Sequence, residues 1–326
     1  MPKEILILGD KKGNAWNFTK EVYNKLVNYP GKNRIYNLGE VEITKFNNRE
    51  IFSRILDNVR TQNCFYIHDS SMDPQDWVIS LAQINDALKR SSANEINDVL
   101  LNMNFSRQDR MTGSKTPISA KVLADIISID ADRVITADLH NPAIMGFYNL
   151  PFDNLRAYPT IIKYLQKNHK DFLRNAVIVA SDVGSAQMAG SYAKRLDLEM
   201  TSAYKIRKKA GIVERIEIMG DLKGKNVLIP DDIIDTAGTI IKGAEKAKQK
   251  GANQIYACAT HGVLSKDKNG IEAIEKLNRS LLEKIIITDS IPQKSNGKIK
   301  IVSLTDLFAE AIYRISNGNS VSELFD

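Results

Sequence analysis

Residues 227–239 read VLIPDDIIDTAGT, and this stretch decides the fold. The apolar run VLIP predicts a buried strand, and the amphipathic segment IIKGAEKAKQK that follows the stretch predicts a helix. Between them lie three carboxylates, Asp231, Asp232 and Asp235, and a turn of small residues. A strand, a turn and a helix in this order are typical of α/β proteins, in which ligands bind beyond the carboxyl ends of parallel strands.

The same alternation continues through most of the chain. Short β-branched runs predict strands at 4–10, 63–69, 97–105, 132–138, 176–182, 226–230, 254–260 and 283–290. Amphipathic segments predict helices at 15–28, 74–91, 117–129, 185–195 and 239–250, the third with Thr116 as N-cap and Pro117 in its first turn. Apolar strands joined by helices indicate parallel sheets covered on both faces, so the predicted fold class is α/β.

The length of 326 residues is sufficient for two domains. Residues 120–141 and 244–263 share a helix, a turn, a strand and a terminal histidine, which weakly suggests two similar halves. Turn residues in NLPFDNLRAYP mark the division. We expect one domain at 1–155, a second at 156–305, and a C-terminal helix and tail at 306–326 that pack on the first domain.

Composition predicts a soluble globular protein, with 43% hydrophobic and 26% charged residues. No apolar run reaches the roughly 20 residues that span a bilayer, and the N-terminus lacks a signal-peptide pattern. The two cysteines, Cys64 and Cys258, lie far apart in apolar runs, which favours a reducing cytoplasm over a disulfide framework. The net charge of +6 is scattered along the chain. We therefore expect anionic small molecules as partners, and neither nucleic acid nor membrane.

The turn after the predicted strand is suited to a phosphate group. Its residues are Thr236, Ala237, Gly238 and Thr239, which combine a compact backbone with two hydroxyl groups at the start of a helix. The three aspartates would repel a free phosphate. A sugar phosphate removes this conflict, because its hydroxyl groups donate to Asp231 and Asp232 while its phosphate occupies the turn. Mg²⁺ would also bind such carboxylates. The alternative is a capped helix after an acidic loop.

Five further segments allow a family to be suggested. They are NFSRQDRMTGSKTPISAKVLADII (104–127), DLHNPAIMGFYNLPFDNL (138–155), THGVLS (260–265), TDSIPQ (288–293) and LFAEAIYRISNGNSVSELF (307–325). With the 227–239 stretch, they resemble in order the ribose-phosphate diphosphokinase (phosphoribosyl-diphosphate synthase) family. The resemblance covers nearly the whole chain and is loosest over the first fifty residues. It implies two similar domains, each a parallel sheet flanked by helices, of the type I phosphoribosyltransferase kind.

The resemblance also implies a reaction and its residues. The family transfers diphosphate from ATP to the anomeric hydroxyl of ribose 5-phosphate with Mg²⁺ as cofactor, which requires positioning and charge neutralisation. By similarity, the catalytic residues are Lys205 and Arg207, and the metal-binding residues are His140 and Asp182. The ATP-binding residues would be Phe46, Asn48, Glu50, Arg107, Gln108 and His140. The ribose 5-phosphate site would comprise Arg207, Asp231, Asp232, Asp235, Thr236, Ala237, Gly238 and Thr239.

The sequence departs from the family pattern in three places. Residues 46–50 read FNNRE where the family usually has FSDGE, so Asn48 lacks a charge and Arg49 replaces a glycine. In SDVGSAQM (181–188), Ser185 stands for the second glycine and Met188 for an arginine. Pro230 precedes the first two aspartates and removes one backbone donor. These changes concern nucleotide selection and regulation more than the sugar site.

Two alternatives to an active diphosphokinase follow from these observations. The altered FNNRE segment would suit a non-catalytic, synthase-like regulatory subunit, although the remaining motifs oppose that interpretation. A phosphoribosyltransferase acting on a base shares the 227–239 loop, but such enzymes are generally shorter and lack the R-Q-D-R segment. By analogy with the family, we expect a homo-oligomer built from dimers, up to a hexamer.

Overall fold

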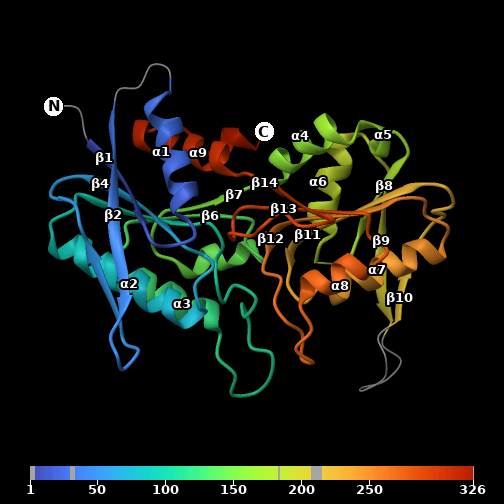
Figure 1. Cartoon of the computed structure of the whole chain (residues 1–326), viewed down its shortest axis with the longest axis horizontal. Helices are drawn as coiled ribbons and strands as arrows, with labels where there is room; N and C mark the ends of the chain where they lie inside the picture. Colours follow the sequence, from blue (N-terminus) through green and yellow to red (C-terminus); the bar gives the residue numbers. More distant parts are fainter. Residues whose placement is uncertain (1–3, 30–33, 183, 207–214, 326) are drawn as a thin grey trace. The chain divides into compact units, whose positions relative to one another are not determined.

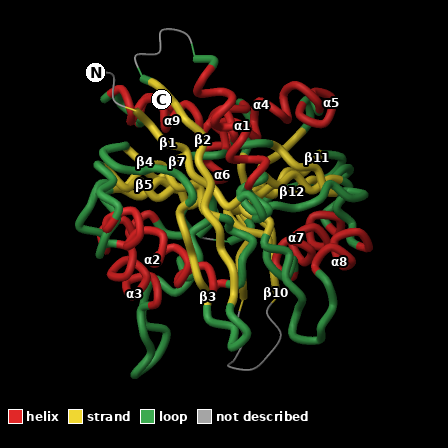
Figure 2. The backbone as a smooth tube through the Cα atoms, turned by 60° about the vertical axis from the view of Figure 1, so that its left-hand side comes forward, coloured by secondary structure: helices red, strands yellow, loops and turns green. Residues whose placement is uncertain are grey.

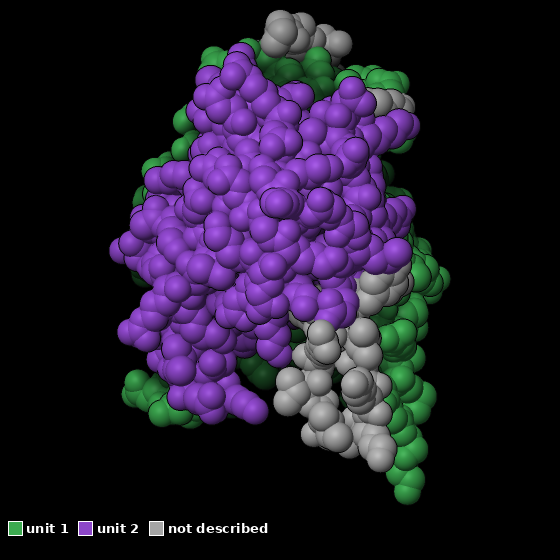
Figure 3. Space-filling view, turned by 90° about the vertical axis from the view of Figure 1, so that its right-hand side faces the viewer, with its two compact units in different colours: residues 1–156, 290–292, 304–326 green, residues 157–289, 293–303 purple. Residues whose placement is uncertain are grey.

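The computed structural model describes residues 4–29, 34–182, 184–206 and 215–325. The chain divides into two compact units, which Figure 3 distinguishes by colour. Unit 1 comprises residues 1–156, 290–292 and 304–326, and unit 2 comprises residues 157–289 and 293–303. No helix in these described ranges combines the length and apolar character needed to cross a membrane.

Unit 1 is a sheet with helices on both faces. Its elements are β1 (Glu4–Asp10), α1 (Trp16–Val27), β2 (Ile35–Lys45), β3 (Ile51–Ile55), β4 (Asn63–His68), α2 (Pro74–Arg90), β5 (Glu95–Leu100), α3 (Ser119–Ile127), β6 (Arg133–Ala137), η1 (Pro142–Phe147), β7 (Phe152–Leu155), α9 (Thr305–Asn317) and η2 (Ser322–Leu324). The strand order is β3-β2-β1-β4-β5-β6-β7, and only β3 runs antiparallel to its neighbour. Helices α1 and α9 cover one face, and α2 and α3 cover the other (Figure 1). Figure 2 shows β2 and β3 continuing past the rest of the sheet as a hairpin.

Unit 2 repeats this arrangement. Its elements are α4 (Tyr158–Asn168), α5 (Lys170–Leu173), β8 (Ala176–Ala180), α6 (Ala186–Leu196), β9 (Met200–Ile206), β10 (Arg215–Ile218), β11 (Asn226–Ile234), α7 (Gly238–Gln249), β12 (Ile255–Gly262), α8 (Ala273–Arg279), β13 (Lys284–Thr288) and β14 (Ile299–Val302). The strand order is β10-β9-β8-β11-β12-β13-β14, with only β10 antiparallel. Helices α4 to α6 cover one face and α7 and α8 the other (Figure 1).

The two matching sheets confirm the predicted fold class of two similar α/β domains. The repeat that suggested it, however, pairs the wrong elements. Its two strands are β6, the sixth in its sheet, and β12, the fifth in the other. By position, β12 corresponds to β5, and β11 corresponds to β4. The similarity of residues 120–141 to residues 244–263 is therefore a general likeness between two helix–strand units.

Burial explains why the central strands are apolar throughout. Every residue of β8 and of β12 is buried, because helices cover both faces of the sheet. In unit 1, Ile7 and Leu8 of β1 are fully buried, as are Leu228 and Ile229 of β11 in unit 2. Each such side chain contributes about 1.5–3 kcal/mol to the hydrophobic stabilisation of its unit. The carboxyl ends of these rigid strands carry the loops that contain the predicted site residues.

Three predicted boundaries were wrong. The strand expected at 97–105 spans Glu95–Leu100 (β5), so it ends five residues earlier than predicted. The helix expected from 117 begins at Ser119, with Ile118 at the N-cap position. The Thr116 hydroxyl instead donates to the Gly113 carbonyl at 2.9 Å and accepts from the amide N–H groups of Thr112 and Gly113, which closes the preceding turn. The strand expected to end at 230 continues to Ile234, because the backbone of β11 keeps pairing with β12 past that point.

Candidate active site

The turn between β11 and α7 has the backbone geometry of an anion site. Strand β11 ends at Ile234 and α7 begins at Gly238, with Ala237 as its N-cap residue. Ala237 has φ 62° and ψ 2°, a left-handed conformation that is uncommon for alanine. The first N–H groups of a helix lack partners within the helix and carry its positive dipole end. This turn therefore presents backbone donors at the carboxyl edge of the sheet, where an anion is stabilised.

Two carboxylates stand immediately before this turn. Asp231 and Asp232 occupy the last part of β11, and the amide N–H of Asp232 donates to Asp231 Oδ1 at 3.0 Å. Burial raises the pKa of the Asp231 carboxyl well above its usual range, and the neighbouring charges of Asp232 and Asp182 raise it further. The site thus holds negative charge that a sugar hydroxyl donor or a cation would stabilise.

The loop after β8 lies against the same carboxylates. Ser181 donates from its hydroxyl to Asp231 Oδ2 at 3.1 Å. The Ser185 hydroxyl accepts the Asp182 N–H at 3.1 Å, and the Ser185 N–H donates to Asp182 Oδ1 at 3.0 Å. Ser185, which replaces a glycine of the family pattern, is buried and orders this loop. The structure therefore brings Asp182 and Asp231 into one electrostatic cluster at the ends of adjacent strands.

Of the two predicted catalytic residues, Lys205 lies at the end of β9. The backbone of Lys205 pairs with Ile216 of β10, and β9 runs parallel to β8. Lys205 therefore lies at the same sheet edge as the loops after β8 and β11. Arg207 lies outside the described residues.

In unit 1, two loops that carry predicted ATP residues are joined. Gln108 lies between β5 and α3, where its side chain accepts from the Ser119 hydroxyl at 2.5 Å. His140 follows β6 and is exposed, as is Arg107. The loops are linked because Asn141 Nδ2 donates to Asp109 Oδ2 at 2.6 Å. The linked loops hold Arg107, Gln108 and His140 on neighbouring strand ends of one sheet.

The segment FNNRE forms the tip of the β2–β3 hairpin. The Phe46 N–H donates to the Glu50 carbonyl at 2.9 Å, and the Arg49 N–H donates to the Phe46 carbonyl at 2.8 Å. Asn48 Oδ1 accepts from the Glu50 N–H at 3.2 Å. Arg49 has φ 73°, the left-handed region that favours glycine, which is the residue that the family pattern has here. The tip is therefore a closed turn that tolerates arginine in a glycine conformation.

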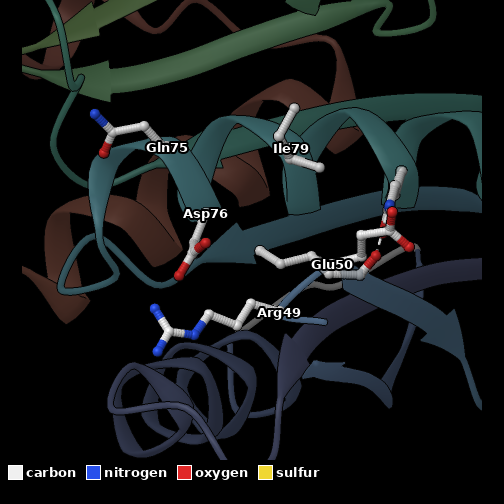
Figure 4. Close-up of a pocket in the computed structure, with 7 residues that line it drawn as sticks. Arg49, Glu50, Gln75, Asp76 and Ile79 are labelled. Atoms are coloured by element: carbon white, nitrogen blue, oxygen red, sulfur yellow. Dashed lines mark hydrogen bonds between the residues drawn. The ribbon is translucent and has the colours of Figure 1, made fainter. Parts of the chain in front are cut away.

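A pocket of about 380 Å³ lies between this tip and α2 (Figure 4). Its lining residues are Arg49, Glu50, Ile51, Gln75, Asp76, Ile79 and Gln83. Figure 4 shows Arg49 and Asp76 pointing toward one another from the hairpin tip and from the first turn of α2. Gln83 Nε2 donates to the Ile51 carbonyl at 2.9 Å and connects the helix to the hairpin. Of the predicted ATP residues, Glu50 contributes to this pocket.

The structure adds contacts that sequence reasoning missed. Lys276, on α8, donates from Nζ to the Thr236 carbonyl at 2.7 Å and to Asp267 Oδ2 at 3.1 Å. In the sequence this lysine belongs to the amphipathic segment IEKLN, which is typical of a solvated helix face. Ser181 was also missed. Ser181 follows β8 and Lys276 follows β12, and both strands are neighbours of β11 in the sheet. These residues could have been identified from the sequence only if the strand order had been known.

The predicted metal pair is divided between the units. His140 lies in unit 1 and Asp182 in unit 2. Within the part of the chain that the structure describes, no cluster of three or more histidine, cysteine, aspartate or glutamate side chains is placed to hold a metal ion. A shared metal site at His140 and Asp182 remains a prediction.

Comparisons with known proteins show the family to which the chain belongs. The family model "N-terminal domain of ribose phosphate pyrophosphokinase" matches residues 14–129, and "Phosphoribosyl synthetase-associated domain" matches residues 205–326. The ribose-phosphate pyrophosphokinase of Caldanaerobacter subterraneus subsp. tengcongensis is 42% identical over 292 residues, which cover 88% of this chain and 90% of that protein. Its counterpart in Rhizobium meliloti is 37% identical over 319 residues, which cover 96% and 98%.

A solved structure extends the likeness to the fold. The phosphoribosylpyrophosphate synthetase of Mycobacterium smegmatis superposes with a TM-score of 0.84 at 27% identity and covers 97% of this chain and 100% of that one. The fold and the site define the class of the protein. It is an α/β transferase of two similar units, with a turn suited to an anion beside a pair of carboxylates. The chain belongs to the ribose-phosphate pyrophosphokinase family.

Proposed function

We propose that the chain transfers the β,γ-diphosphate of ATP to the anomeric hydroxyl of ribose 5-phosphate. The sugar oxygen forms a bond to the β-phosphorus, the bond between that phosphorus and AMP breaks, and the hydroxyl proton is released. The products are 5-phosphoribosyl 1-diphosphate and AMP. The observation that carries the proposal is the adjacency of the Asp231–Asp232 pair to the left-handed turn at Ala237.

In this proposal the sugar phosphate lies along the end of β11. The N–H groups and hydroxyls of residues 235–239 bind the 5-phosphate, and the ribose hydroxyls donate to Asp231 and Asp232. Lys205 and Arg207 neutralise the charge that develops on the transferring diphosphate, the role that cationic side chains have in phosphoryl transfer. In the same proposal, ATP contacts Arg107, Gln108 and His140 and the hairpin residues Phe46, Asn48 and Glu50.

The donor set at Asp231 suits Mg²⁺ as the cofactor. Mg²⁺ in such enzymes usually binds one or two carboxylates together with substrate phosphates and water. Asp182 and Asp231 offer hard oxygen ligands in one cluster. Burial, and then the negative charges of Asp232 and Asp182, raise the pKa of Asp231, and a bound cation would oppose this rise. When bound, Mg²⁺ neutralises phosphate charge. We assign Asp182 to this role from unit 2 and His140 from unit 1.

The proposal also covers the compartment and the assembly of the protein. Both cysteines, Cys64 and Cys258, are free and buried, which supports a reducing cytoplasm. The assembly we propose is a homo-oligomer of dimers, up to a hexamer, by analogy with the family. A non-catalytic regulatory subunit is the second candidate, because the hairpin tip departs from the family pattern at Asn48 and Arg49.

One assay tests the proposal. Purified protein is incubated with ATP, Mg²⁺ and ribose 5-phosphate, and AMP and the phosphoribosyl product are quantified by chromatography. Equal amounts of both are expected, and AMP should not form without the sugar. Asp235→Ala should raise the KM for ribose 5-phosphate far more than the KM for ATP. Binding of ribose 5-phosphate without AMP formation would favour the regulatory subunit.

A further inference from the structure

The turn between β11 and α7, which is the proposed phosphate site, is contacted by Lys276 of helix α8. Lys276 Nζ donates to the Thr236 carbonyl at 2.7 Å, and the same ammonium contacts Asp267 Oδ2 at 3.1 Å. The Lys276 and Asp267 side chains are only 24% and 18% exposed. Asp267 is itself fixed, because it accepts the N–H groups of Asn269 at 2.9 Å and Ile271 at 3.1 Å. The ammonium therefore has a defined position beside the turn.

The carbonyl that Lys276 binds belongs to the peptide between Thr236 and Ala237. In a planar trans peptide the C=O and the N–H point in opposite directions. A donor that fixes the Thr236 carbonyl on the α8 side therefore fixes the Ala237 N–H on the opposite side. Ala237 is buried, with 5% of its surface exposed, and its backbone has φ 62°.

The alternative orientation of this peptide would relieve strain. Rotation of the peptide plane by about half a turn changes ψ of Thr236 and φ of Ala237, and it carries φ of Ala237 to negative values that alanine prefers. The same rotation would direct the Thr236 carbonyl, rather than the Ala237 N–H, toward the anion. The left-handed conformation that Ala237 adopts is thus the less favourable one for an alanine.

We propose that Lys276 is a positioning residue that locks the Thr236–Ala237 peptide in its anion-binding orientation. The proposal rests on the proposed function, because the anion is the phosphate of ribose 5-phosphate. Lys276 acts through the carbonyl and contacts no reacting atom. A charge-assisted hydrogen bond supplies the energy that holds the strained peptide.

The test compares four substitutions in the full-length chain. Lys276→Met keeps the length of the side chain and removes the donor, and it should raise the KM and Kd for ribose 5-phosphate about tenfold, with kcat and the KM for ATP within threefold. Lys276→Arg should retain most of the affinity. Arg279→Met is the matched control, because it removes one positive charge from the same helix, where Arg279 pairs with Glu275. It should leave the affinity within twofold.

The fourth substitution, Ala237→Gly, distinguishes a lock from simple charge attraction. Glycine adopts positive φ as readily as negative φ, so Ala237→Gly should recover most of the affinity that Lys276→Met loses. A Lys276→Met variant with unchanged affinity would overturn the proposal. So would a loss of affinity that Ala237→Gly leaves uncorrected, since that result indicates attraction by charge alone.

A ligand-free measurement separates this inference from the proposed function. Urea denaturation midpoints are compared for the parent, the two single variants and the double variant. A lock predicts non-additive shifts, because Ala237→Gly relieves strain only where Lys276 imposes the left-handed conformation. Additive shifts would overturn the lock even if ribose 5-phosphate binds. Absence of ribose 5-phosphate binding by the parent, with non-additive shifts, would overturn the proposed function and support the lock.

Discussion

The hydroxyl of Ser181, at the end of β8, donates a hydrogen bond to the carboxylate of Asp231 on the neighbouring strand β11 at 3.1 Å. This contact joins two loops that are 50 residues apart in the sequence. It supplies a donor to a carboxylate whose pKa is raised by burial and by adjacent negative charge. Ser181 therefore stabilises the ionised form of Asp231, which in the proposed function is the form that accepts a sugar hydroxyl.

Ser181→Ala should impair sugar binding selectively. Loss of one hydrogen bond to a charged group costs about 1.5–3 kcal/mol, which corresponds to a rise of roughly 10-fold to 100-fold in the KM for ribose 5-phosphate. The KM for ATP should change little. Ser191→Ala on α6 is a suitable control, because that hydroxyl donates only locally, to the Gln187 carbonyl. Equal effects on both substrates would contradict a role for Ser181 in the sugar site.

Lys205→Ala should act on the chemical step. If the lysine neutralises charge mainly in the transition state, kcat should fall on the order of 10²–10³-fold and both KM values should stay nearly constant. Steady-state kinetics with each substrate varied in turn gives these constants. Lys194→Ala on the exposed side of α6 is the control. A kcat within threefold of the parent would show that Lys205 has no catalytic role.

A buried carboxyl in unit 1 should make stability depend on pH. Asp98 of β5 is fully buried, and Asn85 Nδ2 donates to its Oδ2 at 2.9 Å. Burial raises the pKa of Asp98 from 3.8 to about 7, so the folded protein retains a proton that the unfolded chain releases. Stability should therefore be greatest below about pH 4 for this group and decline as pH rises toward 7. The decline should be on the order of 1–4 kcal/mol.

Asp98→Asn isolates this effect, because asparagine resembles the protonated carboxyl and does not titrate. Urea denaturation at pH 5 and pH 7.5 should show a smaller change in unfolding free energy for the variant than for the parent. The variant should gain relative stability at the higher pH. Identical pH dependence in both proteins would mean that Asp98 does not control it.

Asn48→Asp tests how the hairpin tip selects the nucleotide. A carboxylate accepts hydrogen bonds from the adenine amino group, whereas the Asn48 NH₂ also offers donors that suit the guanine carbonyl. The substitution should raise the ATP-over-GTP ratio of kcat/KM by roughly 1–3 kcal/mol if the base is desolvated there. An aspartate keeps the acceptor that the Glu50 N–H uses, so the turn should persist. An unchanged ratio would indicate that Asn48 does not contact the base.

The sequence predicted features that depend on neighbouring residues. The strand, carboxylates and small-residue turn at 227–239 were recognisable because they follow one another directly. The end of β11 was misplaced, since pairing of Ile233 with His261 on β12 extends the strand past the aspartates. Thr116 has an N-cap residue type before a proline, but its hydroxyl closes an earlier turn. The edge strands β3 and β10 were missed because each has at most five residues and mixes apolar with polar side chains.

The remaining site contacts could not have been predicted from local pattern. Lys276 reaches the Thr236 carbonyl across 40 residues, and Asn141 reaches Asp109 across 32. Both contacts depend on which strands are neighbours, and the strand order is a property of the whole sheet. The raised pKa of Asp98 likewise follows from burial beneath a helix rather than from adjacent residues in the chain.

The shared strand order of the two sheets bears on how many sugar phosphates one chain binds. The connection from β4 to α2 in unit 1 has the same position in its sheet as the turn from β11 to α7 in unit 2. In the connection from β4 to α2, Asp73 caps α2 because its side chain accepts the Gln75 N–H at 3.1 Å. Pro74, the first residue of α2, has no N–H to donate to a ligand. That helix end already holds a carboxylate of its own chain. Of these two equivalent positions, the one in unit 1 is occupied by Asp73 and the one in unit 2 is the proposed site for ribose 5-phosphate. We therefore expect each chain to bind one molecule of ribose 5-phosphate.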